Sequence, residues 1–248
     1  MSSDIITNLQ LEKEIETSRV IVVKEINNCD SSFIVSCLIG HCIKSNKALL
    51  LVIGHNSCSH YQNVGVRMGY NMQKYIDSGL IKVYDFAVEN VNLLMSDVSI
   101  SLENVFSKLE DILLQMQEKY SHSNVIFDGI SHLFDLQCTL KQVNMFCSDV
   151  IRQVRNCNKS FVLFNCNVSS EDEVTYVMAN LLSHKAYTLV QVEGLPSGLS
   201  TDVSGHLTIQ YPGKKFDSDH SATLDVPPLL YLYKLFDKGV KLFAPGTV

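Results

Sequence analysis

The chain has 248 residues, of which 19% are charged, and its formal net charge at pH 7 is −6. An acidic chain cannot bind nucleic acid through a generally basic surface, because affinity for phosphate comes from concentrated lysine and arginine. The composition therefore leaves only a local basic patch as a route to nucleic acid, and the length is sufficient for a sizeable core.

The sequence shows no sign of a membrane span or of secretion. No stretch reaches the roughly 18 to 20 apolar residues that a spanning helix requires, and the densest run, 48–53, has the length of a strand. The first residues include Asp4, Glu12 and Glu14 and lack an apolar core, so we expect no signal peptide. The eight cysteines form no Cys-x-x-Cys pair, which is typical of reduced thiols in an intracellular protein.

Short runs rich in β-branched residues alternate with helical patterns in the first 195 residues, which contain no proline. A run that is apolar on both faces, such as 49–53, is typical of a strand in a buried parallel sheet. The predicted strands in this part of the chain span residues 19–26, 47–54, 80–86, 124–128, 160–166 and 186–192.

Three helices are well marked between these strands. Apolar residues recur at helical spacing over residues 101–119, which predicts an amphipathic helix. Thr139 and Gln142 form a capping-box pair ahead of a second apolar stripe. Ser170 and Glu173 form the same pair ahead of a third stripe, so we expect a helix to begin after Ser170.

Beyond Pro196 the sequence predicts strands at 206–211, 229–237 and 240–243, and a tight turn at 237–239 joins the last two in a hairpin. Strands that alternate with helices through right-handed crossovers form a doubly wound parallel sheet, here with antiparallel strands added at one edge. We therefore predict an α/β fold with a RecA-like, mostly parallel sheet and antiparallel C-terminal strands, in a single domain over residues 1–248.

A RecA-like core normally binds nucleotide at the turn after its first strand. There the motif Gly-x-x-x-x-Gly-Lys-Ser/Thr presents backbone N–H groups, a lysine and a magnesium ligand to phosphate. In this chain Glu25 and Asp30 replace the two glycines, Ser31 replaces the lysine, and Ser32 keeps the terminal hydroxyl. Two carboxylates would repel a triphosphate by about 1 kcal/mol per charge pair even in water. We therefore predict no nucleotide at this turn, with Asp30 or Ser31 capping the next helix.

Other candidate sites in the sequence are weaker. Asp128 ends the strand at 124–128, where it could hold magnesium or bond the backbone of the next turn, and we favour the second role. His55, Cys58 and His60 could supply three zinc ligands, but no fourth follows at a recognised spacing, so we favour a polar loop. We expect no catalytic residue, no metal and no cofactor.

Basic residues gather at two places in the sequence. Lys214 and Lys215 follow Pro212 and Gly213 in a polar stretch, where they either form a solvated loop or contact phosphate. Arg152, Arg155 and Lys159 lie at a predicted helix end, where cations stabilise the negative pole of the helix dipole.

Short motifs are spread over nearly the whole chain, with residues 87–123 the least marked part. They are Ser32-Phe33, Ser59-His60-Tyr61 with Gly65 and Gly69, Leu182-Ser183-His184, Glu193-Gly194-Leu195 with Gly198, Asp202-Val203-x-Gly205-x-Leu207, Tyr231-x-Tyr233-Lys234, Asp237-Lys238 and Phe243-Ala244-x-Gly246. This series resembles the Elongator complex protein 6 family.

The resemblance implies a non-catalytic RecA-like subunit without a phosphate loop, which forms a six-membered ring with Elongator subunits four and five, two copies of each. The ring would bind tRNA and support the catalytic Elongator lobe that modifies the wobble uridine. Lys214 and Lys215 are then the candidate tRNA contacts, and the expected location is the cytoplasm, with the nucleus left open as an additional compartment. An independent RecA-like ATPase and a regulatory module of another complex remain open as other functions.

Overall fold

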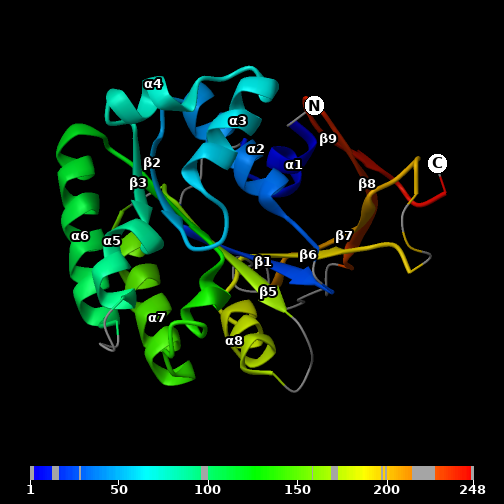
Figure 1. Ribbon diagram of the computed structural model, residues 1–248. Helices are drawn as coiled ribbons and strands as arrows, with labels where there is room; N and C mark the ends of the chain where they lie inside the picture. Colours follow the sequence, from blue (N-terminus) through cyan, green and yellow to red (C-terminus); the bar gives the residue numbers. More distant parts are fainter. Residues whose placement is uncertain are drawn as a thin grey trace, which may run out of the picture.

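The computed structural model describes residues 3–12, 17–27, 29–95, 100–157, 159–168, 173–196, 198, 200–213 and 227–246. These residues form a nine-stranded sheet in the order β3-β2-β4-β5-β1-β6-β7-β8-β9, which runs through the middle of the molecule (Figure 1). The strands are β1 Arg19–Ile26, β2 Ala48–Ile53, β3 Ile81–Asp85, β4 Ser123–Asp128, β5 Phe161–Val168, β6 Thr188–Glu193, β7 Gly205–Gln210, β8 Leu229–Phe236 and β9 Gly239–Phe243.

The six strands that precede Pro196 pair in parallel, and the last three extend the sheet in antiparallel pairs. Parallel neighbours require crossover connections, and the helices between the strands provide them. Phe236 pairs with Gly239 at the turn between β8 and β9, so the predicted hairpin is present. The predicted α/β sheet with antiparallel C-terminal strands is therefore confirmed, with strand ends shifted by one or two residues.

Helices cover both faces of the sheet, with α1 to α4 on one side and α5 to α8 on the other (Figure 1). None of the helices among the described residues is both long and apolar enough to cross a membrane. The helices are α1 Ser3–Asn8, α2 Ser32–Lys44, α3 Cys58–Met68, α4 Met72–Asp77, α5 Phe86–Leu94, α6 Leu102–Lys119, α7 Leu140–Asn156 and α8 Val174–Ser183, with a 3-10 helix η1 at Ile130–Leu133.

Strand β1 shows how one apolar run supplies two cores. Val20 and Val22 pack into the core beneath α6, α7 and α8, whereas Ile21 and Val23 pack into the core beneath α1, α2 and α4. Side chains alternate between the faces of a strand, so a run that is apolar at every position is buried on both sides. Because the central strands are parallel, their carboxyl ends lie together at one edge of the sheet.

The two predicted capping boxes have different outcomes. Thr139 and Gln142 cap α7 reciprocally, as the sequence predicts. The box at Ser170 and Glu173 is wrong, because α8 begins only at Val174 and Glu173 is itself the residue before the helix, without a side-chain cap bond. A residue in that position cannot be the third residue of the same helix. Ser170 lies outside the described residues.

Candidate functional site

The turn between β1 and α2 lies at the carboxyl end of the central strand β1, which β5 and β6 flank in parallel. Ligands of doubly wound sheets bind at this edge. Glu25 is near the end of β1, Ser31 precedes α2 and Ser32 begins it, and all three are buried. The structure thus brings the sequence-predicted residues of this turn together.

Carboxylate oxygens accept the hydrogen bonds of backbone N–H groups that a phosphate would need. Glu25 Oε1 accepts a hydrogen bond from the Ser31 N–H at 2.7 Å. Asp30 Oδ1 accepts one from the Ser32 N–H at 2.7 Å, and Asp30 Oδ2 accepts one from the Ser32 hydroxyl at 2.9 Å. Asp30 therefore caps the start of α2 as predicted. The alternative cap, Ser31, makes no side-chain cap bond.

Asn165 of β5 links the turn to the next strand, and the sequence analysis missed it. Its Nδ2 donates to Glu25 Oε1 at 3.1 Å and approaches Asp128 Oδ1 at 3.5 Å. Its Oδ1 accepts from the Ser31 hydroxyl at 3.2 Å. One amide thus lies between two buried carboxylates. The available signal was a polar residue at a buried position of a mainly apolar strand, opposite Val23 in the parallel register.

Asp128 accepts a hydrogen bond from a backbone N–H group, the kind of bond favoured for it from the sequence, but that group belongs to another loop than the predicted next turn. Its Oδ2 accepts the Asn56 N–H at 2.9 Å, so the loop it supports follows β2 rather than its own strand. Burial, together with the nearby negative charge of Asp128, raises the pKa of Tyr61. The described residues contain no group of three His, Cys, Asp or Glu side chains arranged to hold a metal ion.

His55 of the predicted polar loop contacts a histidine from another loop. His55 Nδ1 lies 2.8 Å from His132 Nε2, and the rings stack with an interplanar angle of 3°. His132 Nδ1 in turn lies 2.8 Å from Asp135 Oδ2. Cys58 and His60 belong to the first turn of α3, which starts at Cys58. The segment is therefore partly helical, not only the loop that the sequence analysis favoured.

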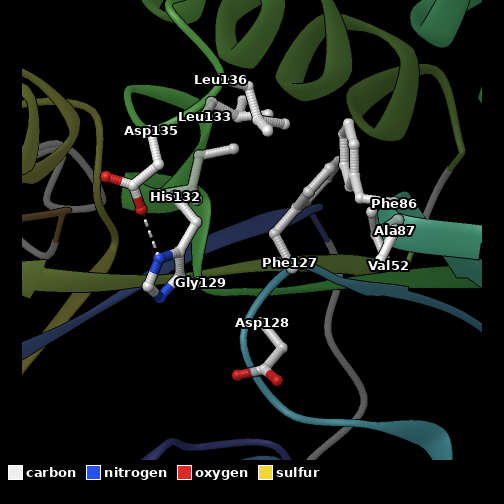
Figure 2. Close-up of a pocket in the computed structure, with 12 residues that line it drawn as sticks. Val52, Phe86, Ala87, Phe127, Asp128, Gly129, His132, Leu133, Asp135 and Leu136 are labelled. Atoms are coloured by element: carbon white, nitrogen blue, oxygen red, sulfur yellow. Dashed lines mark hydrogen bonds and ion pairs between the residues drawn. The ribbon is translucent and has the colours of Figure 1, made fainter. Parts of the chain in front are cut away.

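A cavity of about 220 Å³ lies beside Asp128, between β2, β4 and the residues around η1. Phe86, Phe127, Leu133 and Leu136 give it an apolar lining, and the Asp128 carboxylate points away from these side chains (Figure 2). Among the described residues no lysine or arginine lines it. The lining is therefore mainly apolar, and because its His132 is paired with Asp135 and Asp128 is acidic, it does not suit a phosphate.

The edge of the sheet where nucleotide binds in related folds is thus filled by a network of the chain's own side chains. A triphosphate there would have to displace Glu25 and Asp30 from the N–H groups of α2 and would face both carboxylates at short range. Lys214 and Lys215, the other candidate residues, lie outside the described residues.

Comparison with known proteins decides the family. The family model described as "Elongation complex protein 6" matches residues 5–237. The chain belongs to the Elongator complex protein 6 family. Elongator complex protein 6 of Drosophila melanogaster is 30% identical over 233 residues, covering 91% of this chain and 90% of the relative. The human protein of that name is 24% identical over 237 residues, covering 88% of this chain and 87% of the relative.

A solved structure supports the fold independently of the family. A KaiC-like protein from the hyperthermophilic archaeon Pyrococcus horikoshii superposes with a TM-score of 0.59, covering 91% of this chain and 89% of that protein, at 7% identity. At that identity the likeness concerns the fold alone. The Elongator family member described here therefore has the RecA-like fold predicted from its sequence.

Proposed function

We propose that this chain is a non-catalytic subunit of Elongator that forms a hetero-hexameric ring with subunits four and five, two copies of each. In this proposal the whole chain, residues 1–248, acts as one RecA-like domain. The ring binds tRNA and supports the catalytic lobe during modification of the wobble uridine. The family match supports membership of the complex, and the filled β1–α2 turn supports a structural rather than an ATP-hydrolysing role.

Exposed apolar side chains support a function in assembly. Val177 and Leu181 lie on the outer face of α8, and that helix of ten residues contains no charged side chain. A helix that is apolar on both faces is normally covered by another element. Leu230 and Phe236 of β8, next to the edge strand β9, are also exposed, with 57% and 44% of their surfaces accessible. A protein that remains a monomer rarely leaves so much apolar surface in water.

The tRNA part of the proposal rests on a local basic segment, because the net charge is negative. Replacing Lys214 and Lys215 together with glutamate should leave the ring assembled and weaken tRNA binding about equally across tRNA species. Loss of phosphate contacts also lowers the salt dependence of the affinity. Filter binding of wild-type and variant rings over a salt series measures both effects.

Unchanged affinity and unchanged salt dependence would place the RNA surface on other parts of the ring. A chain that purifies from cells with other partners, and without subunits four and five, would instead favour a regulatory module of another complex. The cytoplasm is the compartment that the proposal assigns, with the nucleus left open as an additional one.

A further inference from the structure

A basic cavity lies at the edge of the sheet opposite the filled turn. It has a volume of about 410 Å³ and lies where β1 and β6 begin and where α7 and α8 end. Three basic side chains line it: Arg155 from the last turn of α7, and His184 and Lys185 from the segment after α8. Among the described residues no carboxylate lines this cavity. On a chain of net charge −6, such a local excess of cations requires an explanation.

Arg155 differs from its neighbour Arg152 on the same helix. Arg152 pairs with Asp149, with Nη2 2.8 Å from Oδ1. Arg155 is exposed, and it forms no ion pair with the described part of the chain. Stabilisation of the helix end was the role that the sequence suggested for both residues, and Arg155 also lines this cavity.

Lys185 is held in place by neutral partners. Its Nζ donates to Asn144 Oδ1 at 3.1 Å and to the Ser148 hydroxyl at 2.7 Å. These bonds to neutral acceptors fix the half-buried ammonium without cancelling its charge. A cation that is already ordered loses less side-chain entropy when it binds an anion.

The helix ends do not neutralise the cavity. A helix C-terminus has the electrostatic effect of roughly half a negative charge, and two such ends, those of α7 and α8, approach this edge. Arg155 and Lys185 together supply two full positive charges, and the imidazole of His184 adds a hydrogen-bond donor. The balance at the cavity is therefore positive.

The wall of the cavity is shaped by a close backbone approach. A Cβ atom at Gly213 would lie 2.6 Å from Cδ2 of Tyr187 and 2.7 Å from its Cα, so only glycine fits there. The Arg19 guanidinium lies 4.5 Å from the centre of the Tyr187 ring, which brings a further cation to the same edge. Lys214 and Lys215 follow in the sequence outside the described residues, and the site is defined without them.

We propose that this cavity binds a backbone phosphate of RNA through Arg155, Lys185 and His184. The inference rests on the proposed function and assigns residues to its tRNA-binding part. A phosphate presents several acceptor oxygens around one centre, and an arginine, a lysine and a histidine from two segments of the chain line this cavity. None of these groups is placed to read a base, so the contact is independent of sequence.

The test compares tRNA binding by the assembled complex with wild-type chain and with Arg155→Glu/Lys185→Glu. A second variant, Arg155→Gln/Lys185→Gln, removes the charge without reversing it. Lys44→Glu is the matched control, because Lys44 is an exposed cation in the last turn of α2, on the other face of the sheet. Filter binding over a salt series gives the affinity and its salt slope, and size-exclusion chromatography reports assembly.

We expect the double glutamate variant to assemble and to bind tRNA roughly tenfold more weakly, with the salt slope smaller by about one unit for each lost phosphate contact. The glutamine variant should lose less affinity but show the same fall in slope, and Lys44→Glu should behave as wild type. Inorganic phosphate that competes equally well with tRNA for the wild-type complex would indicate a site for free phosphate and overturn the assignment to RNA.

Three further outcomes would also overturn it. Wild-type affinity and slope in both double variants would refute the inference and leave the proposed function intact. Loss of a protein partner with unchanged tRNA binding would make the cavity a protein-docking site. A wild-type complex that assembles but does not bind tRNA would refute the tRNA part of the proposed function, and this inference with it.

Discussion

Single residues at the β1–α2 turn show which contacts a sequence can predict. Asp30 caps a backbone N–H only two residues away, and such local hydrogen bonds follow from residue type and spacing. Asn165 reaches Glu25 across 140 positions, and that contact exists only because β1 and β5 pair in one register. The sequence therefore predicts the capping carboxylate, while the bridge between the two buried carboxylates depends on the fold.

Glu25 should stabilise the fold through the donors that it satisfies. Glu25→Ala leaves the Ser31 N–H and the Asn165 amide without this acceptor in a buried site, which should lower the free energy of unfolding by about 2–4 kcal/mol. Glu25→Gln keeps one acceptor oxygen and should cost less. Urea denaturation of these variants, with the exposed Glu118→Ala as control, measures the difference. A loss in Glu25→Ala no larger than in the control would contradict the network.

Buried thiols should make the protein sensitive to alkali. Burial raises the pKa of Cys37, Cys42 and Cys166 from 9.0 to about 12. Between pH 9 and 12 the unfolded chain therefore loses these protons while the folded chain keeps them. Stability is fully present below pH 9 and falls as the pH rises, by about 1.4 kcal/mol per pH unit for each thiol.

The buried Lys24 has the opposite effect on the change of stability with pH. Burial lowers the pKa of its ammonium, so the unfolded chain releases this proton at higher pH than the folded chain. The combined loss of stability from the three thiols exceeds the gain from the one amine. Denaturation midpoints measured from pH 8 upward should therefore fall, and Cys166→Ala, compared with the wild type under the same conditions, should fall less steeply. A midpoint that stays constant or rises over this range would be inconsistent with protonated buried thiols.

At the scale of elements, strands are more predictable than helix starts. The run at 48–53 is apolar at every position and is a strand buried on both faces, because a central parallel strand has no polar side. The start of α8 was misplaced because a Ser-x-x-Glu pair marks a helix start only if the backbone turns at that serine. Helix α3 was not predicted, since its sequence is polar and contains Gly65.

The β1–α2 element should bind ATP and magnesium negligibly in the isolated chain. Its helix N–H groups are taken by Glu25 and Asp30, and the turn has no lysine. Isothermal titration calorimetry of the purified chain should show no binding beyond the heat of dilution. Micromolar affinity would contradict this expectation, whereas hydrolysis by an assembled ring would not, because other subunits could supply the pocket.

At the scale of the whole molecule, the carboxyl and amino ends of the central parallel strands differ in charge. The carboxyl edge of β1 is closed by its own carboxylates, while the opposite edge presents Arg155 and Lys185 without a carboxylate in the cavity they line. Sequence patterns could not reveal the second site, because its cations come from α7 and from the segment after α8, which only the packing of the two helices brings together.

We propose that this chain functions in the assembly of a ring with Elongator subunits four and five and not in catalysis. Native mass spectrometry of the complex purified from cells through a tag on this chain tests the claim most directly. We expect a subcomplex with two copies each of this chain and of Elongator subunits four and five. Recovery of the chain as a monomer, or in a complex that lacks both of those subunits, would contradict it.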